Sequence, residues 1–169
     1  MWKLYSLSKR RFREILFRET FKFRDVAIPL AIGILCFLVN FSVLRFLFSN
    51  FPWIIGLFFG RGSWWIYQPL SVKVVYVIGV APIVEEVIHR RLVLQFFLNR
   101  DMVFTGLIIS SLTFGLHHIL FGWGILKAVD VFFIGMVFGA VYLRYRLFGS
   151  WLTHFSNNLM SVIFTLLRV

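Results

Sequence analysis

Residues 74–98 read VVYVIGVAPIVEEVIHRRLVLQFFL, an apolar segment with five ionisable side chains near its middle. These side chains are Glu85, Glu86, His89, Arg90 and Arg91. Charge at membrane depth is costly and is kept away from lipid by pairing or by water. A chain that holds such a group of charges inside an apolar segment is expected to use some of them. Two histidine-bearing segments follow downstream, and together the three indicate a hydrolytic site in a membrane.

The composition is far more apolar than that of a soluble domain of this length. Of the 169 residues, 60% are hydrophobic and 22 are Phe, and the mean hydropathy is +0.85. Charged residues gather at a few places between long apolar runs, which is the pattern of several transmembrane helices. We therefore predict one all-α membrane domain, a polytopic helix bundle over residues 26–169.

The first 25 residues form a basic and partly amphipathic segment. They hold eight of the 18 Lys and Arg side chains, in a chain whose net charge is +11. Next to an apolar run, such a segment is typical of a cytoplasmic anchor that meets anionic lipid headgroups. We predict an interfacial helix over residues 1–25, membrane lipid as a partner and no nucleic-acid binding. The lone Cys36 excludes an intrachain disulfide.

Five apolar runs are long enough to cross a membrane as helices. The predicted spans are 26–48, a span from 71 that carries the acidic pair, 102–121, 123–143 and 151–167. Residues 49–70 are rich in Gly, Pro and Trp, which is typical of a loop at the far interface, with a short re-entrant piece as the alternative.

Loop charges predict the orientation of these spans. With the N-terminus in the cytoplasm, 13 Lys and Arg side chains fall on the cytoplasmic side and five on the other. Because positive charge favours the cytoplasmic side, this bias predicts a cytoplasmic N-terminus and an external C-terminus.

The acidic pair is the first candidate for chemistry. On a helix, Glu86 and Arg90 lie four residues apart and pair on one face, while Glu85 and His89 share a neighbouring face. One carboxylate is then neutralised, and the other stays available as a general acid or base in a low-dielectric pocket. The alternative is a helix end closed by a salt bridge at the cytoplasmic interface, and the sequence leaves both open.

Two later spans carry the other polar groups. His118 lies four residues after Phe114 and shares a helix face with Ser111. His154 and Asn158 are also four apart and form a polar stripe that should face the bundle interior, although packing alone is the alternative for Asn158. Acid, imidazole and amide groups on three spans can activate water and bind an oxyanion. No nucleophile paired with a base and no phosphate loop is apparent.

Asp130, in the fourth predicted span, is the last intramembrane charge. An acid at this depth needs a partner or water. His117, Lys127 and a site histidine are all candidates, and the sequence does not choose among them.

Three short motifs occur in order: Glu-Glu-x-x-x-Arg at 85–90, Phe-x-x-x-His at 114–118 and His-x-x-x-Asn at 154–158. With their flanking residues they resemble the CAAX-protease and bacteriocin-processing family of intramembrane proteases, also called Abi-like, over about residues 71–165. The resemblance implies an all-helical endopeptidase of the bacterial cell membrane that cuts a membrane-associated peptide or protein. The chain departs from the usual motif at two positions, with His89 in place of a Phe and Arg91 in place of a Gly.

The resemblance also implies roles for individual residues. Glu85 is the catalytic carboxylate, and His118 helps it to hold and deprotonate water. His154 and Asn158 stabilise the tetrahedral oxyanion. The supporting residues, which brace the site, are Glu86 and Arg90.

The cofactor requirement has two alternatives. The family is often labelled metal-dependent, and zinc held by Glu85, His118 and His154 meets the pattern of three protein ligands plus a water. The other alternative, which we prefer, is a metal-free glutamate mechanism. We therefore predict no certain cofactor, with zinc as the candidate divalent metal.

Straight spans raise a geometric difficulty. At about 1.5 Å per residue from the nearest predicted turns, Glu85 and His118 lie roughly 24–26 Å deep and His154 only about 9 Å deep. Straight parallel helices would therefore keep these groups apart. We predict a break near residues 90–91, a surface helix over 92–100 and a tilted or broken third span.

A non-enzymatic membrane protein is the competing interpretation of the same polar groups. A bacteriocin immunity protein or a small substrate-binding subunit of a transporter would use them to bind a ligand or a partner. The sequence names neither the substrate nor the oligomeric state.

Overall fold

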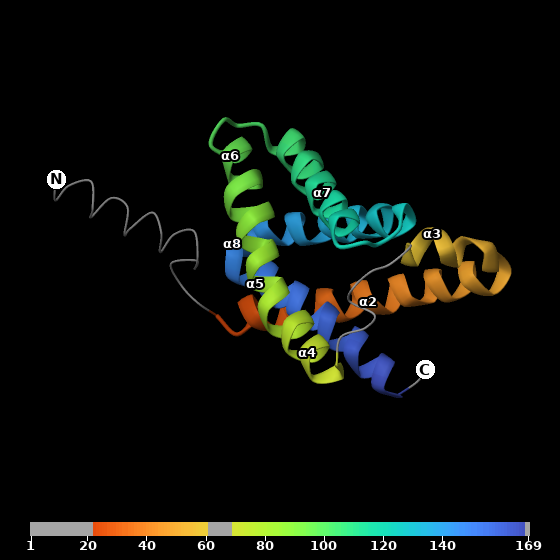
Figure 1. The fold of residues 1–169 in the computed structure, drawn as a ribbon. Coiled ribbons are helices and arrows are strands. Elements are labelled where there is room, and N and C mark those ends of the chain that lie inside the picture. The colour runs from red at the N-terminus through yellow and green to blue at the C-terminus, as the bar shows by residue number, and fades with distance from the viewer. Residues whose placement is uncertain (1–21, 61–68, 168–169) are drawn as a thin grey trace, which may run out of the picture.

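The computed structural model describes residues 22–60 and 69–167 (Figure 1). Within these ranges the chain is helical apart from turns and short connections, and no strand occurs. The predicted all-α class is therefore confirmed. The predicted interfacial helix over residues 1–25 lies almost wholly outside the described residues.

The first long helix, α2 (Arg24–Asn50), matches the first predicted span. Its 27 residues reach about 40 Å, which is enough to cross the hydrocarbon core of a bilayer. A 3₁₀ turn, η1 (Pro52–Ile54), and a short helix, α3 (Ile55–Phe59), follow it. The backbone N–H of Gly124 donates to the Phe58 carbonyl at 2.9 Å, so α3 packs against the start of the last helix. The predicted loop is thus partly helical.

Residues 70–98 form one continuous helical run with two π-helical stretches. In chain order its parts are α4 (Leu70–Val74), η3 (Val75–Val80), α5 (Ala81–Glu86), η4 (Val87–Leu94) and α6 (Gln95–Leu98). The predicted break near residues 90–91 and the predicted surface helix over 92–100 are therefore wrong. A π-helical turn is wider than an α-helical one, so it redirects the following side chains without ending the helix.

The remaining predicted spans lie in two helices. The third span is α7 (Val103–Leu120), which is unbroken. The fourth and fifth spans are the two limbs of α8 (Ile125–Leu167), residues 125–145 and 147–167. The limbs meet at Arg146, whose φ of 61° and ψ of −162° depart from helical geometry and redirect the chain.

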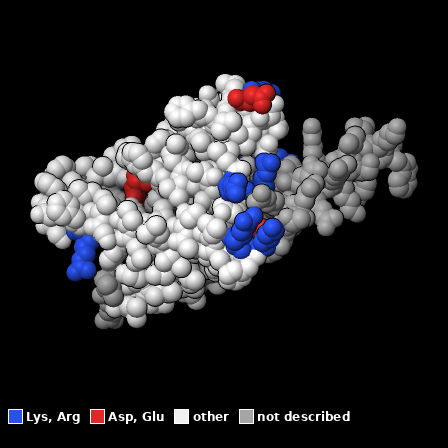
Figure 2. All heavy atoms as spheres, turned by 180° about the vertical axis from the view of Figure 1, so that it is seen from behind, with Lys and Arg blue, Asp and Glu red and all other residues white. Residues whose placement is uncertain are grey.

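The surface of the described residues suits a membrane. Among these residues, α2, α7 and α8 are long and apolar enough to cross one. On the face seen in Figure 2, uncharged side chains cover most of the surface, and most of the visible Lys and Arg side chains lie together in one group. Such a separation of apolar surface from basic charge is typical of membrane proteins.

The helices cross one another rather than run parallel (Figure 1). α8 is central, because both α2 and α7 pack on it along much of their lengths, and α5 also contacts it. The membrane depths predicted for Glu85, His118 and His154 assume straight helices with parallel axes. Because the axes cross, His154 of the second limb reaches the acidic pair of α5 without the predicted break.

Small and hydroxyl residues fix α2 against the second limb of α8. A Cβ on Gly33 would collide with the Ser156 hydroxyl and the Thr153 carbonyl. The Thr153 hydroxyl donates to the Pro29 carbonyl at 3.0 Å, and the Ser156 hydroxyl donates to the Leu30 carbonyl at 3.1 Å. Close backbone approach and interhelical hydroxyl bonds are common glue between membrane helices. They hold the limb that carries His154.

Candidate active site

Glu86 is the most closely held acid of the site, with a side chain only 1% exposed. Its Oε2 lies 3.3 Å from Arg90 Nε and accepts a hydrogen bond from the Ser150 hydroxyl. Its Oε1 lies 3.1 Å from His154 Nδ1. The predicted pairing of Glu86 with Arg90 is confirmed. With both oxygens engaged, Glu86 joins α5 to α8.

Glu85 is held by fewer contacts. Its Oε2 lies 3.5 Å from His154 Nε2, and its side chain is 12% exposed. The imidazole of His154 therefore bridges the two carboxylates, with Nδ1 towards Glu86 and Nε2 towards Glu85. One acid is fixed and its neighbour is more accessible, as the sequence predicts.

Arg90 joins the acidic helix to α7. Its side chain is fully buried, and Nη1 donates to the Ser110 hydroxyl at 3.3 Å. The guanidinium also lies 5.0 Å from the centroid of the Phe114 ring. An ion pair, a hydrogen bond and a cation–π contact together hold this buried charge.

Aromatic rings fix the two predicted catalytic histidines. The ring of Phe114 lies 5.3 Å from that of His118 and 5.6 Å from that of His154, edge to face in both cases. Phe138, from the first limb of α8, lies 4.7 Å from the His154 ring on another side. Both phenylalanines are at most 1% exposed. Such packing restricts the ring orientations of the histidines.

His118 and Asn158 each bond to a backbone carbonyl. His118 Nδ1 lies 3.1 Å from the Phe114 carbonyl oxygen. Because a carbonyl only accepts, this contact assigns the proton to Nδ1 and leaves Nε2 as an acceptor in the neutral ring. Asn158 Nδ2 donates at 2.9 Å to the carbonyl of Val77, in the π-helical stretch η3. The amide retains a second N–H.

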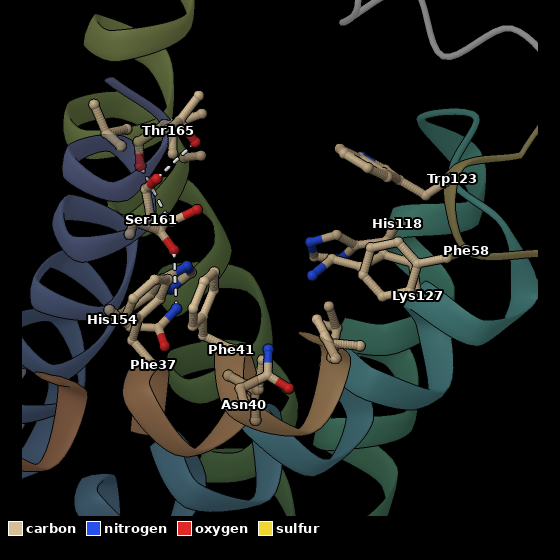
Figure 3. A pocket seen from close by; sticks show the side chains of 18 of the residues that line it. Phe37, Asn40, Phe41, Phe58, His118, Trp123, Lys127, His154, Ser161 and Thr165 are labelled. Atoms are coloured by element: carbon tan, nitrogen blue, oxygen red, sulfur yellow. Dashed lines mark hydrogen bonds between the residues drawn. The ribbon is translucent and has the colours of Figure 1, made fainter. Parts of the chain in front are cut away.

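All four predicted catalytic residues line one cavity of about 890 Å³. They are Glu85, His118, His154 and Asn158. Figure 3 shows His118 on one side of this cavity and His154 on the other. Glu86 and Arg90 do not line it and lie behind its wall. The volume is in the range of ligand-binding pockets.

The predicted zinc ligands do not form a cluster. Among residues 22–60 and 69–167, no three His, Cys, Asp or Glu side chains are grouped closely enough to hold a metal ion. His118 also faces His154 across the cavity (Figure 3). The side chains as arranged do not fit the pattern of three protein ligands around a zinc ion.

Asp130 pairs with Lys127, whose Nζ lies 2.8 Å from Asp130 Oδ2, so Lys127 is its partner among the three predicted candidates.

Sequence reasoning missed Ser150, which is fully buried and bonds Glu86. The signal was available, because Ser150 lies four residues before His154 and so shares its helix face.

His89, where the chain departs from the usual motif, bonds to α7 instead of to Glu85. Its Nδ1 lies 3.1 Å from the Thr113 hydroxyl and its Nε2 lies 3.1 Å from His117 Nδ1. Its ring also packs edge to face on Phe114 at 5.3 Å. His89 is 3% exposed, so it supports the aromatic centre of the site from behind.

We expect His89→Phe to cost about 2 kcal/mol in the free energy of unfolding and His89→Ala to cost more. Phe keeps the ring contact with Phe114 and loses only two hydrogen bonds, each worth about 1 kcal/mol net. Thr113 keeps its bond to the Ser110 carbonyl. Ala also leaves a cavity, for a total of about 3–4 kcal/mol. Thermal unfolding in detergent measures both, and equal losses would show that the ring contact is not important.

Comparison with known proteins identifies the family. The sequence model described as type II CAAX prenyl endopeptidase Rce1-like matches residues 67–160. The chain therefore belongs to this family, as its three motifs predict. No curated protein and no solved structure matched the chain. At the level of the family, this is an integral membrane protein and a CAAX-type protease, for which a peptide or protein is the substrate.

Proposed function

We propose that the chain is an intramembrane endopeptidase that hydrolyses a peptide bond of a membrane-associated peptide or protein with water activated by Glu85 and His118. One observation carries the proposal. Glu85, in contact with His154, lines the same cavity as His118 and Asn158, and this cavity lies among apolar helices. Water and a peptide can meet there away from lipid.

The contacts of the two acids divide their roles. Both oxygens of Glu86 are bonded, so Glu86 is assigned to holding the site together. Glu85 keeps one oxygen, Oε1, that takes no part in its contact with His154. A carboxylate with an available oxygen at a cavity wall suits a general base. His118 Nε2 is an acceptor and can accept a hydrogen bond from the water that Glu85 activates.

The proposed reaction needs water and the residues of the cavity. Glu85 takes a proton from the water, whose oxygen attacks the peptide carbonyl carbon. The second N–H of Asn158 donates to the resulting oxyanion. When the carbon–nitrogen bond breaks, protonated Glu85 returns its proton to the leaving amine. The products are a carboxylic acid and an amine, and Glu85 is regenerated.

His154 receives a different role from the one that the resemblance implies. Both of its ring nitrogens face carboxylates, so neither is directed at an oxyanion. We assign His154 to orienting Glu85 through its contacts with the two carboxylates. Asn158 is then the donor to the oxyanion, and a rotation of His154 would be needed for it to share this role.

The family suggests two kinds of substrate for the proposed reaction. A prenylated C-terminus suits the family name, and a bacteriocin leader suits the wider family that the motifs resemble. With a cytoplasmic N-terminus, the cut would occur near the cytoplasmic face of a bacterial cell membrane.

We expect His118→Ala and Asn158→Ala each to lower kcat by about 100-fold or more. His118→Ala removes the imidazole that holds the attacking water, and Asn158→Ala removes the hydrogen-bond donor to the oxyanion. Cleavage of a fluorogenic membrane peptide by purified protein in detergent measures this effect. Asn99→Ala is a matched control, since Asn99 is exposed at the end of α6 and its side chain bonds Gln95. Peptide binding without cleavage by the wild-type protein would instead favour the non-enzymatic interpretation.

A further inference from the structure

The catalytic cavity contains a lysine that the proposed reaction does not use. Lys127 lines it at the start of α8, and its Nζ lies 2.8 Å from Asp130 Oδ2 and 5.0 Å from the centroid of the Phe58 ring. Figure 3 shows Lys127 on the same side of the cavity as His118, Phe58 and Trp123. A cation in an apolar cavity is costly unless it serves a ligand or a partner.

The ammonium of Lys127 can bind a further anion. It has three N–H donors, and Asp130 takes one of them. Asp130 and the Phe58 ring also hold Nζ in place, so little freedom is lost when a ligand binds. Arg45, from α2, lines the same cavity and adds a second positive charge. The first turn of α8 also favours negative charge, because the N-terminus of a helix is its positive end.

One face of α8 connects Lys127 to the catalytic wall. Lys127, Val131, Ile134 and Phe138 all line the cavity, at spacings of four, three and four residues that place them on one side of the helix. Phe138 packs on the His154 ring at 4.7 Å. The helix rises about 16 Å over these residues, which an extended peptide covers in about five residues. The reach of the lysine side chain shortens this span to about three to five residues.

We propose that Lys127 binds the C-terminal carboxylate of the peptide substrate and thereby sets how far from the C-terminus the chain is cut. The proposal rests on the proposed peptidase function and adds a specificity-determining residue to it. The intervening residues of the peptide lie in the cavity between Lys127 and the catalytic wall. Lys127 is not a catalytic residue in this account.

A peptide carboxylate suits this site better than a free phosphate does. It brings one negative charge to an ammonium that already faces Asp130. It also comes attached to a chain that can fill the cavity between Lys127 and the catalytic wall, which a free phosphate cannot do. Every unmodified peptide C-terminus supplies a carboxylate, whereas an internal segment or a C-terminal amide does not. The discriminating feature is thus the free end of the chain.

The test compares two peptides that differ only at the C-terminus, one with a free carboxylate and one with an amide. Full-length protein in detergent is assayed with both, as wild type, Lys127→Met and Lys127→Arg. Arg144→Met is the matched control, because Arg144 is exposed on α8 and does not line the cavity. Mass spectrometry of the products locates the cut bond, and thermal unfolding checks that each variant is folded.

We expect wild type and Arg144→Met to prefer the carboxylate peptide, with a KM lower by about 10- to 100-fold, the effect of one charge-assisted hydrogen bond. Lys127→Met should lose this preference with kcat little changed, and Lys127→Arg should recover part of it. Adding residues after the cut site should move the cut with the C-terminus. Cleavage of both peptides with equal KM by wild type, or a preference that survives Lys127→Met, would overturn the proposal while the peptidase function stands. Cleavage of neither peptide would overturn both.

Discussion

Glu85→Gln is expected to lower kcat for peptide cleavage by about 100- to 10,000-fold, the usual contribution of a general base. Gln is nearly isosteric with Glu and can keep a polar contact with His154, so the fold and KM should change little. What it loses is the ability to take a proton from water. The loss should therefore appear in kcat, because the base acts in the transition state and not in substrate binding. The measurement is steady-state cleavage of a fluorogenic peptide in detergent.

Asp101→Asn is the matched control for this substitution. It makes the same acid-to-amide change in the exposed turn between α6 and α7, and Asp101 has a φ of 59°, which Asn tolerates well. Its activity should equal that of the wild type. Wild-type kcat in Glu85→Gln would remove Glu85 from the reaction, whereas a parallel loss in Asp101→Asn would indicate a general effect of charge.

Arg90→Met is expected to give the largest loss of stability, about 3–5 kcal/mol. Arg90 is fully buried and Glu86 is 1% exposed, so removing the guanidinium leaves a buried carboxylate without the cation that pairs with it. The Ser110 hydroxyl and the Phe114 ring also lose their contacts with the cation. The measurement is thermal unfolding of the purified protein in detergent, followed by tryptophan fluorescence.

The double variant Glu86→Gln/Arg90→Met separates the buried charge from simple packing. Removing both charges should restore much of the stability that Arg90→Met loses, because a neutral pair is tolerated better than a lone buried charge. The side-chain amide that Glu86→Gln introduces can still accept the Ser150 hydrogen bond through its oxygen. Losses that simply add in the double variant would show that the ion pair is not what the site depends on.

The helices could be predicted from the sequence because their signal is local. Apolar runs of sufficient length predict α2, α7 and the limbs of α8 within a few residues. The predicted break near residues 90–91 is wrong, because depths counted along each helix assume that the helices are straight and parallel. The π-helical stretches and the crossing of the helices depend on tertiary packing, for which the sequence carries no comparable periodic signal.

The sequence predicts the site residues that belong to the three motifs, but not the contacts between helices or the residues outside the motifs. Helical spacing placed Glu86 with Arg90 correctly, since both lie on one helix. The position of His154 between the two carboxylates depends on the contact between α5 and α8 and could not be read from spacing. Phe138 is one of many phenylalanines, so nothing in the sequence distinguished it from ordinary core.

A double-mutant cycle between Glu85 and His118 tests the central claim most directly, because these residues are 33 positions apart in sequence and on different helices. The measured quantity is kcat/KM for wild type, Glu85→Gln, His118→Ala and the double variant. If both residues act on one water in a shared cavity, the double variant should be little worse than the poorer single variant. Losses that multiply fully would mean that the two side chains act independently, which contradicts a common site.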